Sequence, residues 1–198
     1  MCGRFYIDDE TAREIEKTVR KIDEKRAKRG DVYPSDLALV LKAAGGRAVS
    51  QVLKWGYETA EKNRVIFNAR TETVRERPMF RYDYESRRCV IPARKFYEWK
   101  NLGGRKKEKY DFFAEGEILY LAGIYHKNPD GDRFSILTRE AEGCMREIHN
   151  RMPLILSGSD IEKWLFSKEE AVRLLNSHFD RLQRKKSDEE EYRQLSLF

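Results

Sequence analysis

The chain has few cysteines, few prolines and no long apolar segment. Its 198 residues include three cysteines and five prolines. A disulfide-bonded secreted domain would need an even, denser set of cysteines, and no CxxC or HxxxH spacing suggests a metal site. The longest apolar stretch, residues 118–125, is far shorter than the ~20 residues of a membrane-spanning helix, and no N-terminal segment resembles a secretory signal. We therefore expect a cytoplasmic protein that needs no membrane, metal or cofactor.

Charge is abundant and unevenly placed. Lysine and arginine total 40 against 34 acidic residues, for a net charge of +6. Residues 188–198 contain four acids and one arginine, a local charge of −3, so the rest of the chain carries +9. A basic body suits a polyanionic partner such as nucleic acid, because neutralised phosphates supply most of the sequence-independent affinity. A charged surface that only contacts water is the alternative.

Short apolar runs separated by turn-forming residues predict strands through the middle of the chain, with helices at both ends. The expected strands cover residues 37–43, 49–55, 89–91, 96–99, 110–114, 118–125 and 134–137. The expected helices run from Asp8 or Asp9 to Gly30, over residues 71–77 and 141–148, and onward from the capping residues Ser159 and Ser167. This order predicts an α+β fold, in which a mixed, mostly antiparallel sheet curls into a barrel-like core with peripheral helices. We expect one domain, residues 1–182, and an acidic flexible tail, residues 183–198.

Cys2 is the most informative residue because of its position. If the initiator Met1 is removed, as a small second residue permits, Cys2 presents a thiol and a free α-amine on adjacent carbons. An α-amine has a pKa of about 7.7–8.0, so a substantial fraction is neutral and nucleophilic at pH 7. Such an amine forms a Schiff base with an aldehyde, and the thiol can then close a five-membered thiazolidine. The alternative is a cysteine without function at a frayed terminus.

Seven short segments occur in an informative order. They are MCGRF (1–5), WG (55–56), NARTE (68–72), RPMFR (77–81), RCVIPA (88–93), FYEW (96–99) and HNRMP (149–153). Together they resemble the SRAP family (SOS-response-associated peptidase), and the resemblance runs from residue 1 to about residue 166. Two departures lie beside expected site residues: Arg94-Lys95 replaces an acidic residue and glycine, and Ser35 stands where threonine is common.

The resemblance implies an SRAP-like fold and a protein that binds an abasic site in single-stranded DNA or at a single/double-strand junction. Cys2 would couple covalently to the ring-opened sugar aldehyde as a thiazolidine and so shield the lesion from strand cleavage. Removal of Met1 by the protein itself is compatible with this chemistry. We expect a monomer associated with the nucleoid.

The resemblance also implies catalytic roles. Cys2 would be the nucleophile, and Glu98 the general acid and base that moves a proton from the attacking amine to the leaving hydroxyl. His149 would protonate the sugar ring oxygen and assist reversal of the adduct. Asn68 would orient the Cys2 amine or a sugar hydroxyl. The alternatives are an ordinary strand glutamate, a structural histidine and a turn-forming asparagine.

A further set of residues would contact DNA. The phosphate ligands would be Arg4, Arg70, Arg81 and Arg151. Surface ion pairing is the alternative for these arginines, above all for Arg81 and Arg151. Trp55 and Trp99 would stack on bases beside the abasic gap, with core packing as the alternative, above all for Trp55. Pro34 would shape the backbone, and Thr138 would contact sugar or phosphate.

The acidic tail ends in a second candidate motif. Gln194, Leu195, Leu197 and Phe198 resemble the short peptide with which bacterial replication and repair proteins bind the sliding clamp. Glutamine supplies directional hydrogen bonds, and the apolar residues fill a cleft while a tether lets the domain reach DNA. A last strand packed on the chain's own domain is an equal alternative.

Two other functions remain open at this point. An N-terminal-nucleophile amidohydrolase or peptidase would also use a processed Cys2, with its α-amine as the base. No glutamine-pocket segment supports that reading, and a glutaminase assay would discriminate. A non-covalent single-stranded DNA-binding module would leave Cys2 incidental, so Cys2→Ala would bind DNA normally.

Overall fold

The computed structural model describes residues 2–18, 27–59 and 64–187 and has the expected α+β composition. The strands are β1 (Phe5–Ile7), β2 (Gly30–Val32), β3 (Leu37–Ala44), β4 (Arg47–Trp55), β5 (Tyr57–Glu58), β6 (Val65–Ile66), β7 (Asn68–Arg70), β8 (Arg88–Ala93), β9 (Lys95–Asn101), β10 (Lys107–Phe113), β11 (Leu119–His126), β12 (Arg133–Glu140), β13 (Arg151–Pro153), β14 (Ile155–Leu156) and β15 (Gln183–Lys186). The helices are α1 (Asp9–Thr18), α2 (Pro78–Ser86), α3 (Ile161–Phe166) and α4 (Lys168–Leu174), with 3-10 turns η1 (Gly143–Met145) and η2 (Gly158–Asp160).

The larger sheet closes on itself. Its strands follow the order β13-β12-β4-β3-β8-β11-β14, and β11 also pairs with β12, so the path returns to its start. β12 pairs in parallel with β4 and β7, whereas the other pairs are antiparallel. The predicted mixed, barrel-like sheet is therefore confirmed. The ring is uneven, since β3 and β8 share only two residue pairs.

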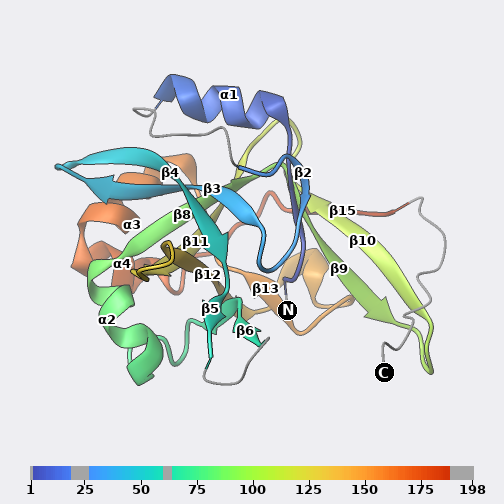
Figure 1. Cartoon of the computed structure of the whole chain (residues 1–198). Coiled ribbons are helices and arrows are strands. Elements are labelled where there is room, and N and C mark those ends of the chain that lie inside the picture. Colours follow the sequence, from blue (N-terminus) through green and yellow to red (C-terminus); the bar gives the residue numbers. More distant parts are fainter. Residues whose placement is uncertain (1, 19–26, 60–63, 188–198) are drawn as a thin grey trace.

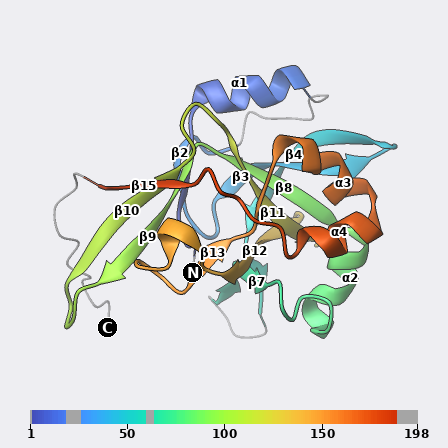
Figure 2. The same cartoon turned by 180° about the vertical axis from the view of Figure 1, so that it is seen from behind.

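A second, five-stranded sheet has the order β15-β10-β9-β1-β2. It joins the first where β8 runs into β9, at Arg94, whose N–H donates to the Tyr6 carbonyl at 2.8 Å. Helix α1 lies over one end of the sheets, and α2, α3 and α4 gather on the side away from β9 and β10 (Figures 1 and 2). None of the helices in the described ranges is both long and apolar enough to span a membrane.

Several helix predictions are wrong, for local reasons. Residues 71–77 form turns, and α2 begins at Pro78, because proline ends one segment but also suits the first turn of the next. The predicted 141–148 helix is reduced to η1, where Gly143 has φ +52°. Gly30 opens β2 instead of ending a long first helix. Ser167 caps α4 as predicted by accepting the Glu170 N–H at 3.2 Å, whereas Ser159 lies within η2.

The end of the domain extends further than the composition indicates. Gln183–Lys186 form β15 and pair with β10, so the expected flexible tail does not begin at residue 183. Lys186 pairs with Tyr110, and the N–H of Ser187 donates to the Lys109 carbonyl at 3.0 Å. Residues 188–198, which include the expected clamp-binding residues Gln194, Leu195, Leu197 and Phe198, lie outside the described residues.

Candidate active site around Cys2

Cys2 lies where the N-terminal segment meets both sheets. Its side chain is fully buried, and its thiol donates to the Arg4 carbonyl at 3.8 Å. The Cys2 carbonyl accepts a 2.9 Å hydrogen bond from Asn68 Nδ2. Burial raises the pKa of the Cys2 thiol, and the nearby charge of Glu98 raises it further. The thiol is therefore protonated at neutral pH, next to a carboxylate.

Glu98 reaches this point through strand register. β1 pairs with β9 at Phe5 and Phe96, and the N–H of Tyr97 donates to the Arg4 carbonyl at 3.0 Å. Side chains alternate along a strand, so Glu98 shares the inner face with Phe96, while Tyr97 projects to the other face. Glu98 is 3% exposed. A carboxylate in a largely dry setting is therefore held beside the thiol.

Asn68 and His149 come from the larger sheet. β7 runs parallel to β12 and places Asn68 beside Ile136. His149 precedes β13, which pairs with the same β12. Its Nδ1 lies 3.2 Å from the Arg151 carbonyl oxygen and 2.9 Å from the Arg151 backbone nitrogen, and in the tautomer that accepts this shorter bond the proton is on Nε2. This nitrogen is the one that can donate to a ligand.

Arg4 lies in an aromatic cage. Its guanidinium carbon is 4.7 Å from the ring centroid of Tyr33, 5.6 Å from that of Tyr97 and 5.0 Å from that of Trp99. Its Nη1 donates to Asp31 at 3.5 Å, and Asp31 also accepts a 2.7 Å bond from the Tyr97 hydroxyl. The predicted DNA contacts Arg4 and Trp99 are thus adjacent and already stacked.

Arg151 has a different environment. Nη1 and Nη2 bind the Glu72 carboxylate at 2.6 and 2.9 Å, and Nη2 also donates to the Thr138 carbonyl at 2.6 Å. The ion-pair alternative therefore holds for Arg151. The hydrogen bonds from Arg151 lower the pKa of Glu72. For Arg70 and Arg81, both exposed, no ion pair is found within the described ranges.

Two of the expected DNA contacts, Trp55 and Thr138, have fully buried side chains. Trp55 is fully buried: its ring stacks on Phe134 and packs against Phe5 and Phe67, and its indole N–H donates to the Phe67 carbonyl at 2.9 Å. Thr138 is also fully buried. The core-packing alternative therefore describes Trp55 in this structure.

Pro34 is the second residue of a turn beside Arg4. Residues 33–36 have the arrangement of a type II turn: the Asp36 N–H donates to the Tyr33 carbonyl at 3.0 Å, and Ser35 has φ +78°. The N–H of Ser35 donates to the Trp55 carbonyl at 2.7 Å, and the Trp55 N–H donates to the Asp36 carbonyl at 2.9 Å. The buried tryptophan thus fixes the turn through its backbone.

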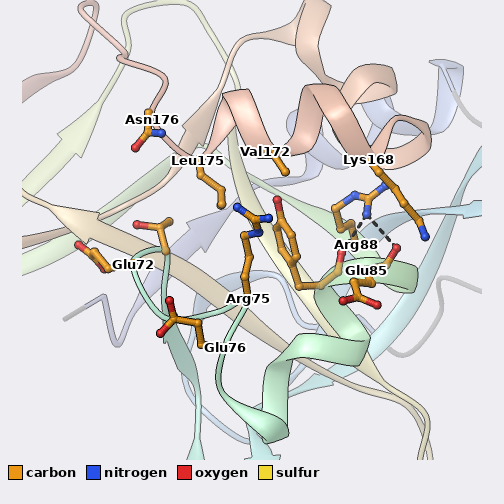
Figure 3. A pocket seen from close by; sticks show the side chains of 11 residues that line it. Glu72, Arg75, Glu76, Glu85, Arg88, Lys168, Val172, Leu175 and Asn176 are labelled. Atoms are coloured by element: carbon orange, nitrogen blue, oxygen red, sulfur yellow. Dashed lines mark hydrogen bonds between the residues drawn. The ribbon is translucent and has the colours of Figure 1, made fainter.

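A separate cavity of about 710 Å³ lies between the 71–76 turn, α2 and α4 (Figure 3). Arg75 rises into it, and Glu72 belongs to its wall. None of the four expected catalytic residues lines it. In the part of the chain that the structure describes, no group of three histidine, cysteine or acidic side chains is placed to hold a metal ion.

Comparison with known proteins agrees with the resemblance. The profile of the family described as SOS response associated peptidase (SRAP) matches residues 1–194. The chain belongs to this family. Bacillus subtilis YoqW, named an abasic site processing protein, is 33% identical over 184 residues, which cover 85% of this chain and 81% of YoqW. Escherichia coli YedK, with the same description, is 27% identical over 177 residues, covering 83% and 79%.

Solved structures share the SRAP-like fold. A phage-related protein from Bordetella bronchiseptica superposes with a TM-score of 0.78 at 21% identity, covering 95% of each chain. A Bacteroides thetaiotaomicron protein gives a TM-score of 0.73 at 24% identity, covering 93% of this chain and 91% of that one. At these identities the likeness establishes the fold.

Proposed function

We propose that this protein binds an abasic site in single-stranded or junction DNA and couples Cys2, after loss of Met1, to the sugar aldehyde. Family membership and the names of the curated relatives support the lesion as substrate. The observation that carries the proposal is the arrangement at Cys2: its carbonyl is held by Asn68 at 2.9 Å and its thiol lies beside Glu98.

The coupling begins with the α-amine. Its nitrogen attacks the aldehyde carbon to give a carbinolamine, and loss of hydroxide with a proton, as one water, gives the imine. The thiol sulfur then bonds to the imine carbon while its proton passes to the nitrogen, which closes the thiazolidine. The net product is the ring plus one water. Because the pKa of the thiol is raised, the amine is the better first nucleophile.

Three other side chains have defined tasks in these reaction steps. Glu98 takes the proton released by the amine and returns it to the departing hydroxyl. His149 donates from Nε2 to the ring oxygen as the sugar opens. Asn68 Oδ1 is buried and has no hydrogen-bond partner among the described residues, so it can accept from the α-amine and orient its lone pair.

A denaturing gel with an abasic oligonucleotide tests the coupling. Wild-type protein is expected to give a band that survives denaturant without reduction. Cys2→Ser keeps an N-terminal amine but lacks sulfur, so its adduct should survive only after borohydride traps the imine. A wild-type adduct that also requires borohydride would contradict thiazolidine formation.

The same samples separate the alternatives. A non-covalent binding module predicts retarded native complexes but no denaturant-stable band from wild type. An amidohydrolase predicts ammonia release from glutamine that Cys2→Ser abolishes. We expect neither result.

We further propose that Glu98 and His149 assist removal of Met1. In a translation extract without aminopeptidase, wild-type protein should lose Met1 and Glu98→Gln should retain it, as read by intact mass. Retention of Met1 by wild type in that extract would assign the processing to another enzyme.

The chain end supports a second proposal, that a monomer binds the bacterial sliding clamp through Gln194, Leu195, Leu197 and Phe198. A peptide of residues 188–198 should bind purified clamp, whereas a scrambled peptide should not. Deletion of the final five residues should leave DNA coupling intact. Absence of measurable peptide binding would retire the idea.

A further inference from the structure

Tyr33 combines three features that the proposed mechanism does not use. Its side chain is 39% exposed, although it lies beside the site. One cation, Arg4, lies 4.7 Å from its ring centroid, and a second, Lys28, lies 5.0 Å from it. It also opens a turn whose third residue, Ser35, has φ +78°. An exposed aromatic ring held over an arginine next to a candidate DNA site is a surface on which a base can stack.

The turn holds this ring in place before any ligand binds. The N–H of Tyr33 donates to Asp36 Oδ2 at 2.8 Å, and Asp36 also binds the Lys28 ammonium at 2.5 Å. Both sides of the turn are hydrogen-bonded to the backbone of Trp55 in the core. Among the described residues, Ser35 is the one non-glycine residue at positive φ, a conformation that persists where surrounding contacts enforce it. The backbone that carries the Tyr33 ring is therefore fixed before a ligand binds.

Arg4 connects the ring to the site. Its guanidinium lies between Tyr33 and Trp99, at 4.7 and 5.0 Å from the two centroids, and Arg4 is two residues from Cys2. Lys28 lies near the same ring with its side chain 40% exposed, and its ammonium is bound by Asp36 at 2.5 Å. We infer that Tyr33 stacks on an unpaired base that flanks the abasic sugar, an inference that rests on the proposed function.

Fluorescence of a base analogue tests the stacking. Single-stranded DNA would carry 2-aminopurine on one side of a tetrahydrofuran abasic analogue, which lacks the aldehyde and so separates binding from coupling. Wild type and Tyr33→Phe should quench the fluorescence in at least one of the two placements. Tyr33→Leu should lose that quenching and bind about 5- to 160-fold more weakly, as expected for one lost base–aromatic contact.

Two controls locate the effect. Phe166→Leu changes an aromatic residue of similar exposure, 43%, at the end of α3, and should bind as wild type. The salt dependence of Tyr33→Leu binding should equal that of wild type, because stacking releases no counterion; a slope lower by about 1 would mean that the variant acts through Arg4.

The outcomes are distinguishable. If wild type couples to abasic DNA but Tyr33→Leu binds and quenches like wild type, stacking by Tyr33 is wrong and the proposed function stands. If wild type neither binds the analogue nor couples, both are wrong.

Discussion

The two arginines beside the candidate site are held in contrasting ways. Arg4, on the five-stranded sheet, is surrounded by aromatic rings and has one long contact, 3.5 Å, with Asp31. Arg151, on the larger sheet, binds Glu72 through two short hydrogen bonds and a backbone carbonyl through a third. Arg4 is buried and has no close carboxylate partner, so a phosphate that reached it would compete only with the long Asp31 contact, whereas a phosphate at Arg151 would have to displace a carboxylate.

This difference indicates separate tasks for the residues around Arg4 and for those around Arg151. The side around Arg4 also carries Glu98 and Trp99 on β9, and it presents the groups that would touch DNA. The side around Arg151 positions other groups, because the N–H of Arg151 fixes the Nδ1 of His149 at 2.9 Å. Four experiments, with six variants and one control, test or sharpen this division.

Glu98→Gln on the Arg4 side is expected to have the largest effect. The amide keeps the shape but cannot accept and return a proton, so the coupling rate at saturating abasic DNA should fall about 10²- to 10⁴-fold. Quenched-flow sampling on denaturing gels measures this rate. Glu85→Gln, at an exposed position of α2, is the matched control. A wild-type rate for Glu98→Gln would remove Glu98 from the mechanism.

The two tryptophans should respond in different assays. Trp55→Ala leaves a cavity in the closed sheet and should lower the free energy of unfolding by about 3–5 kcal/mol, measured by urea denaturation. Trp99 is half-buried, so Trp99→Ala should lower the free energy of unfolding by less and should instead weaken DNA binding. Equal losses of stability would contradict the division.

The two arginines can be compared through salt. Arg4→Gln should reduce the slope of log K against log salt concentration by about 1, because one phosphate contact is lost. Arg151→Gln should leave that slope unchanged, because the Arg151 guanidinium already binds Glu72 and the backbone N–H that holds His149 is retained. A reduced slope for Arg151→Gln would show that Arg151 exchanges Glu72 for phosphate.

The Glu72–Arg151 pair should contribute least to stability. The folded pKa of Glu72 is lowered, so its contribution is present above the unfolded pKa and is lost as the pH falls through the folded pKa. The Glu72 side chain is 49% exposed, which limits the effect to less than about 1 kcal/mol. Glu72→Gln should therefore unfold slightly more easily than wild type at pH 7 and equally in acid. A difference in the free energy of unfolding between wild type and Glu72→Gln that widens in acid would contradict the assignment.

Segment order predicted the family, the fold and the neighbours of Cys2, because motif residues converge when their strands pair. Sequence could not predict burial within a motif. Trp55 and Trp99 each follow a charged residue in a strand, Lys54 and Glu98, yet only Trp55 is fully buried. Nor could it predict which acid pairs with Arg151, since Glu72 is 79 residues away.

Other features could not be predicted because their sequence signals are ambiguous. Pro78 ends a segment and begins α2, and composition alone does not choose between the two. Tyr33 had one usable signal, an aromatic residue immediately before Pro34 in a turn. Its contact with Arg4 depends on pairing between β1 and β2, which local sequence does not specify.

Intact-mass and peptide-level mass spectrometry of the coupled protein tests the central claim most directly. We predict a polypeptide lacking Met1, joined at Cys2 to the abasic oligonucleotide, with the combined mass reduced by one water. An adduct on a lysine, or coupled protein that still carries Met1, would contradict it.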